Sequence, residues 1–447
     1  MAKDKTIYYC TECGSTQLKW AGKCPDCGAW NSMEERKVSK KSRKVKIGSK
    51  STPRPLKANR QKKLKRITTR IDEFDRVLGG GFVTGSVLLL GGEPGVGKST
   101  LMLQILDRIK DKECIYFSGE ESEEQIRMRA DRLQIQNGEI LLSCENSMEK
   151  IMHFMDKMNP DIVVIDSIQT IYSEQLTNIP GSITQVKECS GQLTRKAKEI
   201  GCITIFVGHI TKSGNIAGPK VMEHLVDTVL YLEGGENNLY RVLRSMKNRF
   251  GSTNEVGIFS MDESGLNPVK NPSSFFLSER NSDAPGTAIA VSMEGTRPFL
   301  IEIQALVTAS SYGNPQRTAH GIGYKRLAML IAVLEKRAGY QMGTQDVFVN
   351  IVGGMKIDET AINLSLVAAM ASSFRDVSLP SDSAFIGEVG LVGEVRSVPF
   401  IKQRVKEASK FGYKNIYLPQ KNVKNLNVEG VILTGVNSIE HFFNLVF

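Results

Sequence analysis

A glycine-rich stretch at residues 88–100 contains the residue types that bind a polyphosphate. It matches the spacing Gly-x4-Gly-Lys-Ser/Thr of a phosphate-binding loop at Gly92, Gly97, Lys98 and Ser99. Glycines let consecutive backbone N–H groups point at one ligand, and a helix that begins near the lysine adds the positive end of its dipole. In such loops the lysine contacts the β- and γ-phosphates, and the hydroxyl after it binds Mg2+. We predict that a nucleotide is bound by Gly92, Glu93, Pro94, Gly95, Val96, Gly97, Lys98, Ser99 and Thr100.

Two acidic side chains are candidates for the chemistry at the bound phosphates. Asp166 ends an apolar run that begins after Asp161, and a carboxylate at the end of such a strand holds Mg2+ through water. Glu120 follows a second apolar run and is our candidate for the base that polarises the attacking water. Glu121 beside it has the same chemistry, so the choice between the two glutamates depends on geometry.

A histidine ends a further apolar run, at residues 202–208. His209 could be an ordinary core histidine whose ring is hydrogen-bonded inside the protein. Its position at a strand end, beside Thr211 and Lys212, favours a role in sensing the bound nucleotide. We therefore include His209 among the residues that contact the nucleotide.

These side chains can meet only if the apolar runs before them form one parallel sheet. The runs alternate with helical stretches, a pattern typical of a parallel sheet covered on both faces. Ligands of such sheets lie beyond the carboxyl ends of the strands. The sequence therefore predicts an α/β fold, and it disfavours the alternative of a chance Gly-Lys-Ser in a turn. The side chains expected to converge are those of Lys98, Glu120, Asp166 and His209.

Four of the eight cysteines form two Cys-x2-Cys pairs separated by ten residues, and a glycine follows each pair. Such turns aim two thiolates at one point, and two turns complete the tetrahedral sulfur shell that Zn2+ prefers. A redox pair, the alternative, would not explain two such turns without a thioredoxin-like strand and helix. The only tryptophans, Trp20 and Trp30, are expected to pack around this small module rather than to stack on bases. The predicted zinc ligands are Cys10, Cys13, Cys24 and Cys27.

The positive charge of the chain is concentrated in one segment. Residues 36–66 contain 15 of the 58 Lys and Arg residues and no acidic residue, which leaves 43 basic against 48 acidic residues elsewhere. A solvated linker explains such a run, and so does a linker that also contacts nucleic-acid phosphates. Composition does not decide between these two interpretations.

Two polar, glycine-containing loops are candidates for contact with a polyanion. They span residues 173–187 and 211–220, after the third and fourth predicted strands. Loops at these positions of an open α/β ATPase suit a mobile polyanion, although ordinary surface loops are the alternative. The candidate DNA-binding lysines are Lys187, Lys212 and Lys220.

A second α/β unit is expected after a Ser-, Asn-, Pro- and Gly-rich junction near residue 270. Its composition alone indicates no function. No run of the chain reaches the ~18 apolar residues of a membrane span, and the N-terminus resembles no secretory leader, so we expect a cytoplasmic protein without membrane contact. The predicted strands of this unit are 288–291, 300–307, 347–352, 385–388, 394–398 and 416–418, and its predicted helices are 324–337, 360–373 and 401–411.

The order of these features closely resembles the bacterial RadA (Sms) recombination proteins over essentially the whole chain. The most specific element is Lys247-Asn-Arg-Phe-Gly251, which matches a motif of that family and follows the zinc knuckles, basic linker and phosphate loop. The resemblance implies a RecA-type ATPase in the middle region, which uses ATP and Mg2+. It also implies that Glu120 is the catalytic glutamate, that Lys98 and Ser99 form the Walker A pair, and that Asp166 is the Walker B acid.

The same resemblance implies an assembly and a substrate. Lys247 and Arg249 would be supplied across a subunit boundary to stabilise charge on the transferred phosphoryl group, as arginine fingers do. This arrangement implies a ring, which we expect to be a hexamer. Proteins of this kind drive branch migration of recombination intermediates on single-stranded and branched DNA beside the recombinase RecA.

The C-terminal half resembles the Lon proteolytic domain, with a departure at the nucleophile. Where that peptidase has Pro-Ser-Ala-Gly, this chain has Glu359-Thr360-Ala361-Ile362, although Lys402 lies near the position of the dyad lysine. The glutamate and the missing glycine are unfavourable for an oxyanion hole. We expect this domain to be a non-proteolytic platform for assembly and DNA binding. For the whole chain we expect a DNA-stimulated ATPase, with an ATP-dependent protease and a non-hydrolysing DNA scaffold as the alternatives. The expected domains are a zinc module at 1–35, a basic linker at 36–66, a RecA-like ATPase at 67–270 and a Lon-like domain at 271–447.

Overall fold

A computed structural model of the chain gives two compact units whose segments are interleaved along the sequence. One unit comprises residues 1–233, 243–253 and 263–266, and the other comprises 234–242, 254–262 and 267–447. The expected boundary at residue 270 stays a prediction. The structure describes residues 5–10, 16–25, 28–38, 65–209, 222–234, 240–277, 284–310, 313–424 and 426–447.

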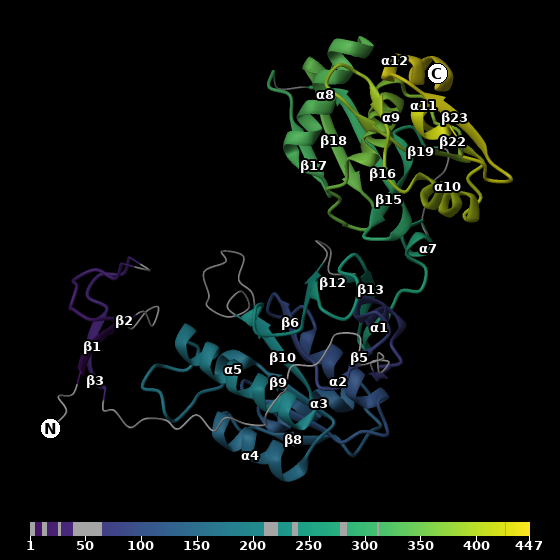
Figure 1. The fold of residues 1–447 in the computed structure, drawn as a ribbon. Helices are drawn as coiled ribbons and strands as arrows, with labels where there is room; N and C mark the ends of the chain where they lie inside the picture. Colours follow the sequence, from purple (N-terminus) through teal and green to yellow (C-terminus); the bar gives the residue numbers. More distant parts are fainter. Residues whose placement is uncertain are drawn as a thin grey trace, which may run out of the picture. The chain divides into compact units, whose positions relative to one another are not determined.

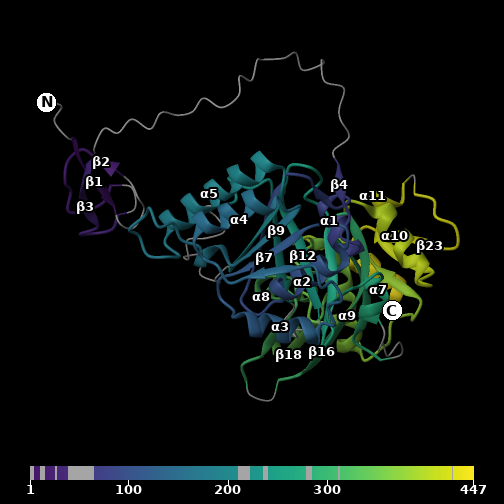
Figure 2. The ribbon, with the colours of Figure 1, turned by 90° about the horizontal axis from the view of Figure 1, so that it is seen from below.

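The N-terminal module is a small antiparallel sheet. Strand β1 (Lys5–Cys10) lies between β2 (Thr16–Gln17) and β3 (Met33–Val38), as Figure 2 shows. Its interior is a cluster of Cys10, Cys24 and Met33, against which Tyr8 packs. Such a small interior cannot stabilise a fold by apolar burial alone, and domains of this size usually depend on a metal or on disulfides.

Parallel strands form the centre of the first unit, as predicted. They are β11, β6, β10, β9, β7 and β8, and the sheet that contains them has the order β14-β13-β12-β11-β6-β10-β9-β7-β8. The four strands predicted to precede the site residues are almost fully buried, as expected for strands covered on both faces. The strands are β6 (Val87–Gly92), β7 (Cys114–Ser118), β8 (Leu141–Ser143), β9 (Ile162–Asp166), β10 (Ile203–His209), β11 (Thr228–Gly234), β12 (Tyr240–Asn248), β13 (Val256–Asp262) and β14 (Gly265–Pro268).

Helices connect these strands and cover the sheet (Figure 1). Helices α4 and α5 bury Met148, Ile151 and Leu193 in one apolar cluster with residues of β6, β7 and β9. Helix α3 begins with a capping box at Ser122, whose side chain accepts from the Gln125 backbone N–H. The elements are β4 (Arg66–Ile67), α1 (Asp72–Leu78), β5 (Phe82–Val83), α2 (Lys98–Arg108), α3 (Glu123–Arg132), α4 (Met148–Met158), the 3-10 turn η2 (Ile168–Thr170) and α5 (Ile183–Ile200).

The second unit is built on a seven-stranded mixed sheet of order β17-β18-β16-β15-β19-β22-β23. Helix α9 is buried along most of its length and packs on β15 and β16. The strands are β15 (Thr287–Glu294), β16 (Arg297–Ala309), β17 (Arg317–His320), β18 (Gln345–Ile351), β19 (Ser383–Phe385), β22 (Asn415–Pro419) and β23 (Ile432–Val436), with a hairpin of β20 (Glu388–Val389) and β21 (Val395–Arg396). The helices are α7 (Pro272–Leu277), α8 (Tyr324–Ala338), η3 (Met342–Thr344), η4 (Thr360–Ile362), α9 (Asn363–Arg375), α10 (Ile401–Lys410), α11 (Gln420–Val423) and α12 (Ile439–Val446).

The sequence predictions for this unit are confirmed in outline. Each predicted helix is present, and the predicted strand at 385–388 is divided between β19 and β20. Strands β17 and β23 and helix α12 were not predicted. Among the residues that the structure describes, no helix is both long enough and apolar enough to cross a membrane.

Candidate nucleotide-binding and hydrolysis site

The predicted phosphate-binding loop connects β6 to α2. Gly97 precedes the first helical residue with φ of 108°, a conformation that side chains other than hydrogen rarely adopt. The turn at Gly97 therefore directs the N-terminus of α2, with its free backbone N–H groups, toward the loop. The loop and the helix start thus have the geometry that the spacing predicts.

Lys98 is held inside this loop, with 4% of the residue exposed. Its Nζ donates to the carbonyl oxygens of Gly92 and Glu93 at 3.0 and 2.9 Å and lies 3.2 Å from Nδ1 of His209. Burial lowers the pKa of Lys98, and the nearby carboxylates of Asp166 and Glu120 partly offset this effect. The ammonium group is therefore placed at the mouth of the loop, where a polyphosphate would replace its carbonyl partners.

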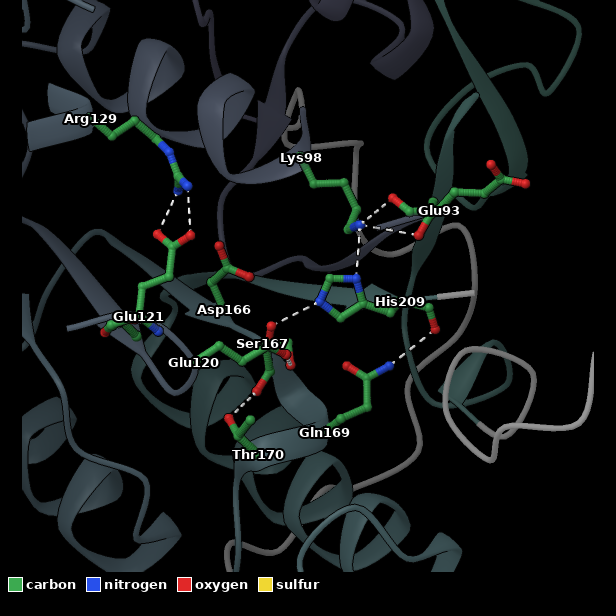
Figure 3. A network of polar contacts seen from close by, with 12 residues as sticks. Glu93, Lys98, Glu120, Glu121, Arg129, Asp166, Ser167, Gln169, Thr170 and His209 are labelled. Atoms are coloured by element: carbon green, nitrogen blue, oxygen red, sulfur yellow. Dashed lines mark hydrogen bonds and ion pairs between the residues drawn. The ribbon is translucent and has the colours of Figure 1, made fainter. Parts of the chain in front are cut away.

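His209 joins Lys98 to Glu120 (Figure 3). Because an ammonium group can only donate, Nδ1 of the ring accepts from Lys98, and Nε2 carries the proton. Nε2 lies 3.1 Å from Oε2 of Glu120 and donates to it. The ring of His209 therefore connects the phosphate-binding lysine to the candidate base by two direct contacts.

The two glutamates at the end of β7 have different environments. The carboxylate of Glu120 accepts from Ser167 Oγ and from His209, whereas that of Glu121 accepts from both terminal nitrogens of Arg129, at 2.6 and 2.5 Å. Figure 3 shows the Glu121–Arg129 pair pointing away from Lys98. The geometry thus places Glu120, and not Glu121, beside the phosphate-binding loop.

Asp166 and Ser99, the two predicted Mg2+ ligands, lie near the same phenol. The hydroxyl of Tyr116 donates to Oδ2 of Asp166 and also interacts with the side chain of Ser99. Burial and the neighbouring Asp166 raise the pKa of Tyr116 well above its usual value, so the phenol stays protonated and can donate. A carboxylate and a hydroxyl at one point are the donors that Mg2+ prefers, so these residues fit the ion.

Three residues of the turn after Asp166 belong to this network and were missed in the sequence. Ser167 donates to Glu120, Thr170 donates to the Ser167 carbonyl oxygen at 2.7 Å, and Gln169 Nε2 donates to the His209 carbonyl oxygen at 3.1 Å. The turn also packs tightly on Gly119, where an added Cβ would lie 1.8 Å from Oγ1 of Thr170. The run Ser-Ile-Gln-Thr directly after the Walker B acid was the available signal, since polar residues at that strand end face the site.

The motif at residues 247–251 lies at the opposite edge of the sheet. Arg249 Nη1 donates to Oδ1 of Asp227 at 3.0 Å, and the other oxygen of this buried carboxylate accepts from the backbone N–H of Val87 at 3.1 Å. Val87 is the first residue of β6, whereas the phosphate-binding loop follows its last residue, roughly 17 Å away along a six-residue strand.

Lys247 contacts residues of its own chain at the same edge. Its Nζ donates to the carbonyl oxygens of Glu223 and Val226 at 2.6 and 2.8 Å. Burial, followed by the charge of Arg249, lowers the pKa of Lys247. The structure therefore does not bring Lys247 or Arg249 to the phosphate-binding loop of the same chain.

The predicted DNA-binding lysines are only partly covered by the structure. Lys187 is exposed on α5, two residues after the buried Gln185. Gln185 holds the preceding loop through the backbone of Ser173 and the Asn178 carbonyl oxygen. Lys212 and Lys220 lie outside the described residues, as do residues 39–64 of the basic linker.

The structure describes two of the four predicted zinc ligands. Cys10 and Cys24 come from different Cys-x2-Cys turns and are buried in one cluster, as a shared metal requires. Cys13 and Cys27 lie outside the described residues, and within the part of the chain that the structure describes no three metal-binding side chains form a cluster. The positions of Cys10 and Cys24 are therefore consistent with two thiolate ligands of one zinc ion.

The expectation for the tryptophans is wrong. Trp20 and Trp30 are 60% and 73% exposed and do not pack inside the module. Among the described residues of the module, the buried cluster consists of Cys10, Cys24 and Met33 with Tyr8 packed against it, and neither tryptophan belongs to this cluster.

The region of the Lon-like nucleophile contains an ion pair. Glu359 is paired with Arg404, which is 0% exposed, and also accepts from Ser292 Oγ at 3.0 Å and from the Met293 backbone N–H at 2.8 Å. The hydroxyl of Thr360 donates to Glu388 at 2.7 Å. Lys402 is exposed on α10, and among the described residues it forms no hydrogen bond with Thr360, whose hydroxyl is paired with Glu388.

Comparison with known families gives three matches along the chain. Residues 8–35 match the family described as rubredoxin metal binding domain, residues 67–143 and 134–267 match KaiC, and residues 337–436 match the Lon protease (S16) C-terminal proteolytic domain. These matches confirm the predicted fold class of a zinc ribbon, a RecA-like ATPase core and a Lon-like domain.

Curated relatives match over almost the full chain. DNA repair protein RadA of Bacillus subtilis is 47% identical over 98% of both chains. The protein of the same name from Listeria monocytogenes is 47% identical over 98% of this chain and 97% of its own, and that of Streptococcus pyogenes is 44% identical over 100% of both. At this identity and coverage, the chain belongs to the RadA family of bacterial DNA repair proteins.

Proposed function

We propose that the protein is a DNA-stimulated ATPase that processes recombination intermediates in DNA repair, by branch migration beside a RecA-type recombinase. The relatives named as DNA repair proteins support the process, and the match to the KaiC family supports ATP hydrolysis. The observation that carries the mechanism is the contact chain Lys98–His209–Glu120, because it joins the phosphate-binding lysine to a carboxylate. This role places the protein in the cytoplasm with the chromosome.

Hydrolysis starts with an exchange of partners at Lys98. When the phosphates of ATP enter the loop, Nζ of Lys98 releases the carbonyl oxygens of Gly92 and Glu93 and binds phosphate oxygens. Mg2+ held by Ser99 and Asp166 would neutralise charge on the same phosphates. His209 then loses its contact with Lys98 and can donate to the γ-phosphate instead.

Movement of His209 frees one oxygen of Glu120. That oxygen can accept a hydrogen bond from water and orient it for attack, while Ser167 holds the other oxygen in place. Glu121 is not available for this task because both of its oxygens are paired with Arg129. We therefore assign the role of base to Glu120 and the role of positioning residue to Ser167.

A matched pair of substitutions tests this assignment. Glu120→Gln should lower ATP turnover by about 10²- to 10⁴-fold, because an amide cannot take a proton from water. Nucleotide affinity should stay near that of the unchanged protein, since Glu120 does not hold the phosphates. Glu121→Gln, the control, should lower turnover by less than about tenfold. Steady-state ATPase rates and nucleotide titrations measure both effects, and equal losses in the two variants would contradict the assignment.

We further propose that Lys247 and Arg249 complete the site of a neighbouring subunit in a ring, which we expect to be a hexamer. The location of both residues supports this proposal, because they lie at the edge of the sheet opposite the phosphate-binding loop of their own chain. Arg249 keeps half of its side chain exposed, so its guanidinium group is accessible to a partner. A cation supplied in this way stabilises the charge of the transferred phosphoryl group.

Mixing two inactive variants tests the shared site. Arg249→Ala should lower turnover by about 10³-fold or more with little change in nucleotide affinity. In a 1:1 mixture with Lys98→Ala subunits, about one quarter of randomly formed interfaces should contain both intact residues, and activity should recover accordingly. A mixture of Lys98→Ala with the Lys98→Ala/Arg249→Ala double variant is the control and should stay inactive. If the first mixture also stays inactive, the residues do not act across subunits.

We propose that the Lon-like domain is a non-proteolytic platform. The hydroxyl of Thr360 donates a hydrogen bond to the carboxylate of Glu388, and not to a lysine as in a Ser–Lys dyad. The adjacent Glu359 forms an ion pair with Arg404. Peptide hydrolysis that disappears in Thr360→Ala would support a protease instead.

The experiment that tests the proposed function is the ATPase rate with and without single-stranded and branched DNA across salt concentrations. We expect DNA to stimulate turnover and the stimulation to fall as salt rises, because phosphate contacts release counterions. A rate unaffected by either DNA would refute a DNA-dependent motor and leave a scaffold that binds ATP without coupling it to DNA.

A further inference from the structure

The zinc module has an apolar surface that its own fold does not use. Three of its large apolar side chains are strongly exposed, namely Leu18 at 77%, Trp20 at 60% and Trp30 at 73%. An exposed indole is costly in water, and exposed aromatic side chains grouped on a small domain usually mark a binding surface. Nothing in the ATPase mechanism above involves these residues.

The two indoles are grouped at one short segment of the module. Trp30 pairs with Lys23 as an antiparallel bridge, and Nζ of Lys23 lies 5.5 Å from the centre of the Trp30 ring. Trp20 lies on the same segment, because a Cβ added at Gly22 would be 3.7 Å from Cη2 of its ring. Two aromatic faces and one ammonium group are therefore located around Gly22 and Lys23.

Backbone hydrogen bonds hold this segment in place. The backbone N–H of Asn31 donates to the Gly22 carbonyl oxygen at 2.8 Å, and the N–H of Cys24 donates to the Ala29 carbonyl oxygen at 2.8 Å. Cys24 itself is buried in the interior cluster, so the segment is anchored where the predicted zinc would be bound. These contacts restrict the backbone that carries the two indoles, so less backbone freedom is lost when a ligand binds.

We propose that Trp20, Trp30 and Lys23 form a stacking platform for the bases of single-stranded nucleic acid. Aromatic side chains that stack on bases, together with cations that contact the backbone, are the combination that binds single strands without sequence preference. Lys19 and Lys23 place two positive charges in residues 18–24, a stretch without an acidic residue, and this local charge complements a polyanion rather than a purely apolar protein surface. The proposal rests on the DNA-processing function only for the choice of nucleic acid as the partner.

The chain provides its own probe for this platform. Because it contains two tryptophans in total, the intrinsic indole fluorescence of the full-length protein reports on Trp20 and Trp30 alone. Titration with an oligothymidylate should quench this fluorescence, because bases stack directly on the rings. An abasic oligomer of the same length and charge should bind more weakly and quench little. This comparison separates stacking from attraction by the basic linker, which both oligomers experience equally.

Variants then assign the contacts. Trp20→Ala and Trp30→Ala should each weaken oligothymidylate binding by about 5- to 50-fold, and the phenylalanine variants should recover much of the affinity because they keep an aromatic face. Lys23→Ala should reduce the slope of the logarithm of affinity against the logarithm of salt concentration by about 1, which corresponds to the loss of one phosphate contact. Leu18→Ala is the matched control, since it removes an equally exposed apolar side chain that cannot stack, and its affinity should not change. Zinc content and far-ultraviolet circular dichroism verify that each variant is folded.

Different outcomes separate this proposal from the proposed function. Equal quenching by the abasic oligomer, or unchanged affinity in both alanine variants, would overturn the platform even if DNA stimulates the ATPase. Quenching that appears only with a recombinase, and not with DNA, would assign the surface to a protein partner and also overturn it. Base-dependent quenching in a protein whose ATPase ignores DNA would support the platform and refute the DNA-dependent motor.

Discussion

Replacing Lys98 with methionine should lower ATP turnover by about 10³-fold or more while the protein stays folded. The ammonium group is the only cation that contacts both the phosphate-binding loop and His209 among the described residues. Methionine fills a similar volume, so the buried position does not become a cavity. Steady-state hydrolysis and the thermal unfolding midpoint measure the two effects.

The control for this variant is Lys110→Ala, which removes an exposed lysine shortly after the same helix. Its turnover should equal that of the unchanged protein. Turnover near the unchanged level in Lys98→Met would refute the assignment of the loop, whatever its nucleotide affinity. The variant also tests the contact chain, because without Lys98 the ring of His209 loses the partner that orients it.

The second large effect is expected on stability, in the Lon-like domain. Arg404 is fully buried and donates to the carbonyl oxygens of Val291 and Pro399 at 2.6 and 3.0 Å as well as to Glu359. Arg404→Ala would leave the carboxylate of Glu359 without its cation, and loss of one partner of a buried pair costs about 3–5 kcal/mol. We expect the free energy of unfolding of this domain to fall by that amount.

The measurement must report on the Lon-like domain alone. Tryptophan fluorescence does not, because both tryptophans lie in the zinc module. Hydrogen exchange of the backbone amides in β15 and α9 reports on it directly. Lys402→Ala, on the same helix but exposed, is the control and should change stability by less than about 0.5 kcal/mol. Equal amide protection in both variants would show that the ion pair contributes little.

Local patterns predicted much of the nucleotide site. The apolar runs that became β6, β7, β9 and β10 are continuous and short, and parallel strands buried on both faces need that composition. Once the strands are parallel, the residues that follow them must share one edge of the sheet. The convergence of Lys98, Glu120 and His209 is therefore a consequence of topology as much as of any single motif.

Residue spacing alone left the choice between Glu120 and Glu121 open, and only the family resemblance favoured Glu120. The two glutamates are adjacent in the sequence and have the same chemistry, so they differ only in the direction in which their side chains point. What separates them is Arg129, eight residues later on α3, which pairs with Glu121. This contact depends on how α3 packs, and no local pattern specifies it. The carboxylate of Asp227 is a similar case, since the residues it contacts, Val87, Lys198 and Arg249, are far apart in the sequence.

The prediction for Trp20 and Trp30 failed because the interior of the zinc module is small. Large aromatic residues are usually buried, but among the described residues of this module the apolar interior consists of Cys10, Cys24 and Met33, which is too small to cover two indoles. The rule that large aromatic residues are buried holds for domains with a sizeable core, and this module is too small for the rule to apply.

The location of Arg249 has a kinetic consequence. If its own phosphate-binding loop lies at the far end of β6, a single subunit can hold a nucleotide and still lack the cation that completes the reaction. ATP hydrolysed per subunit would then depend on protein concentration, low in dilute solution and constant once assembly is complete. The concentration at half of the maximal rate would measure how tightly the subunits associate.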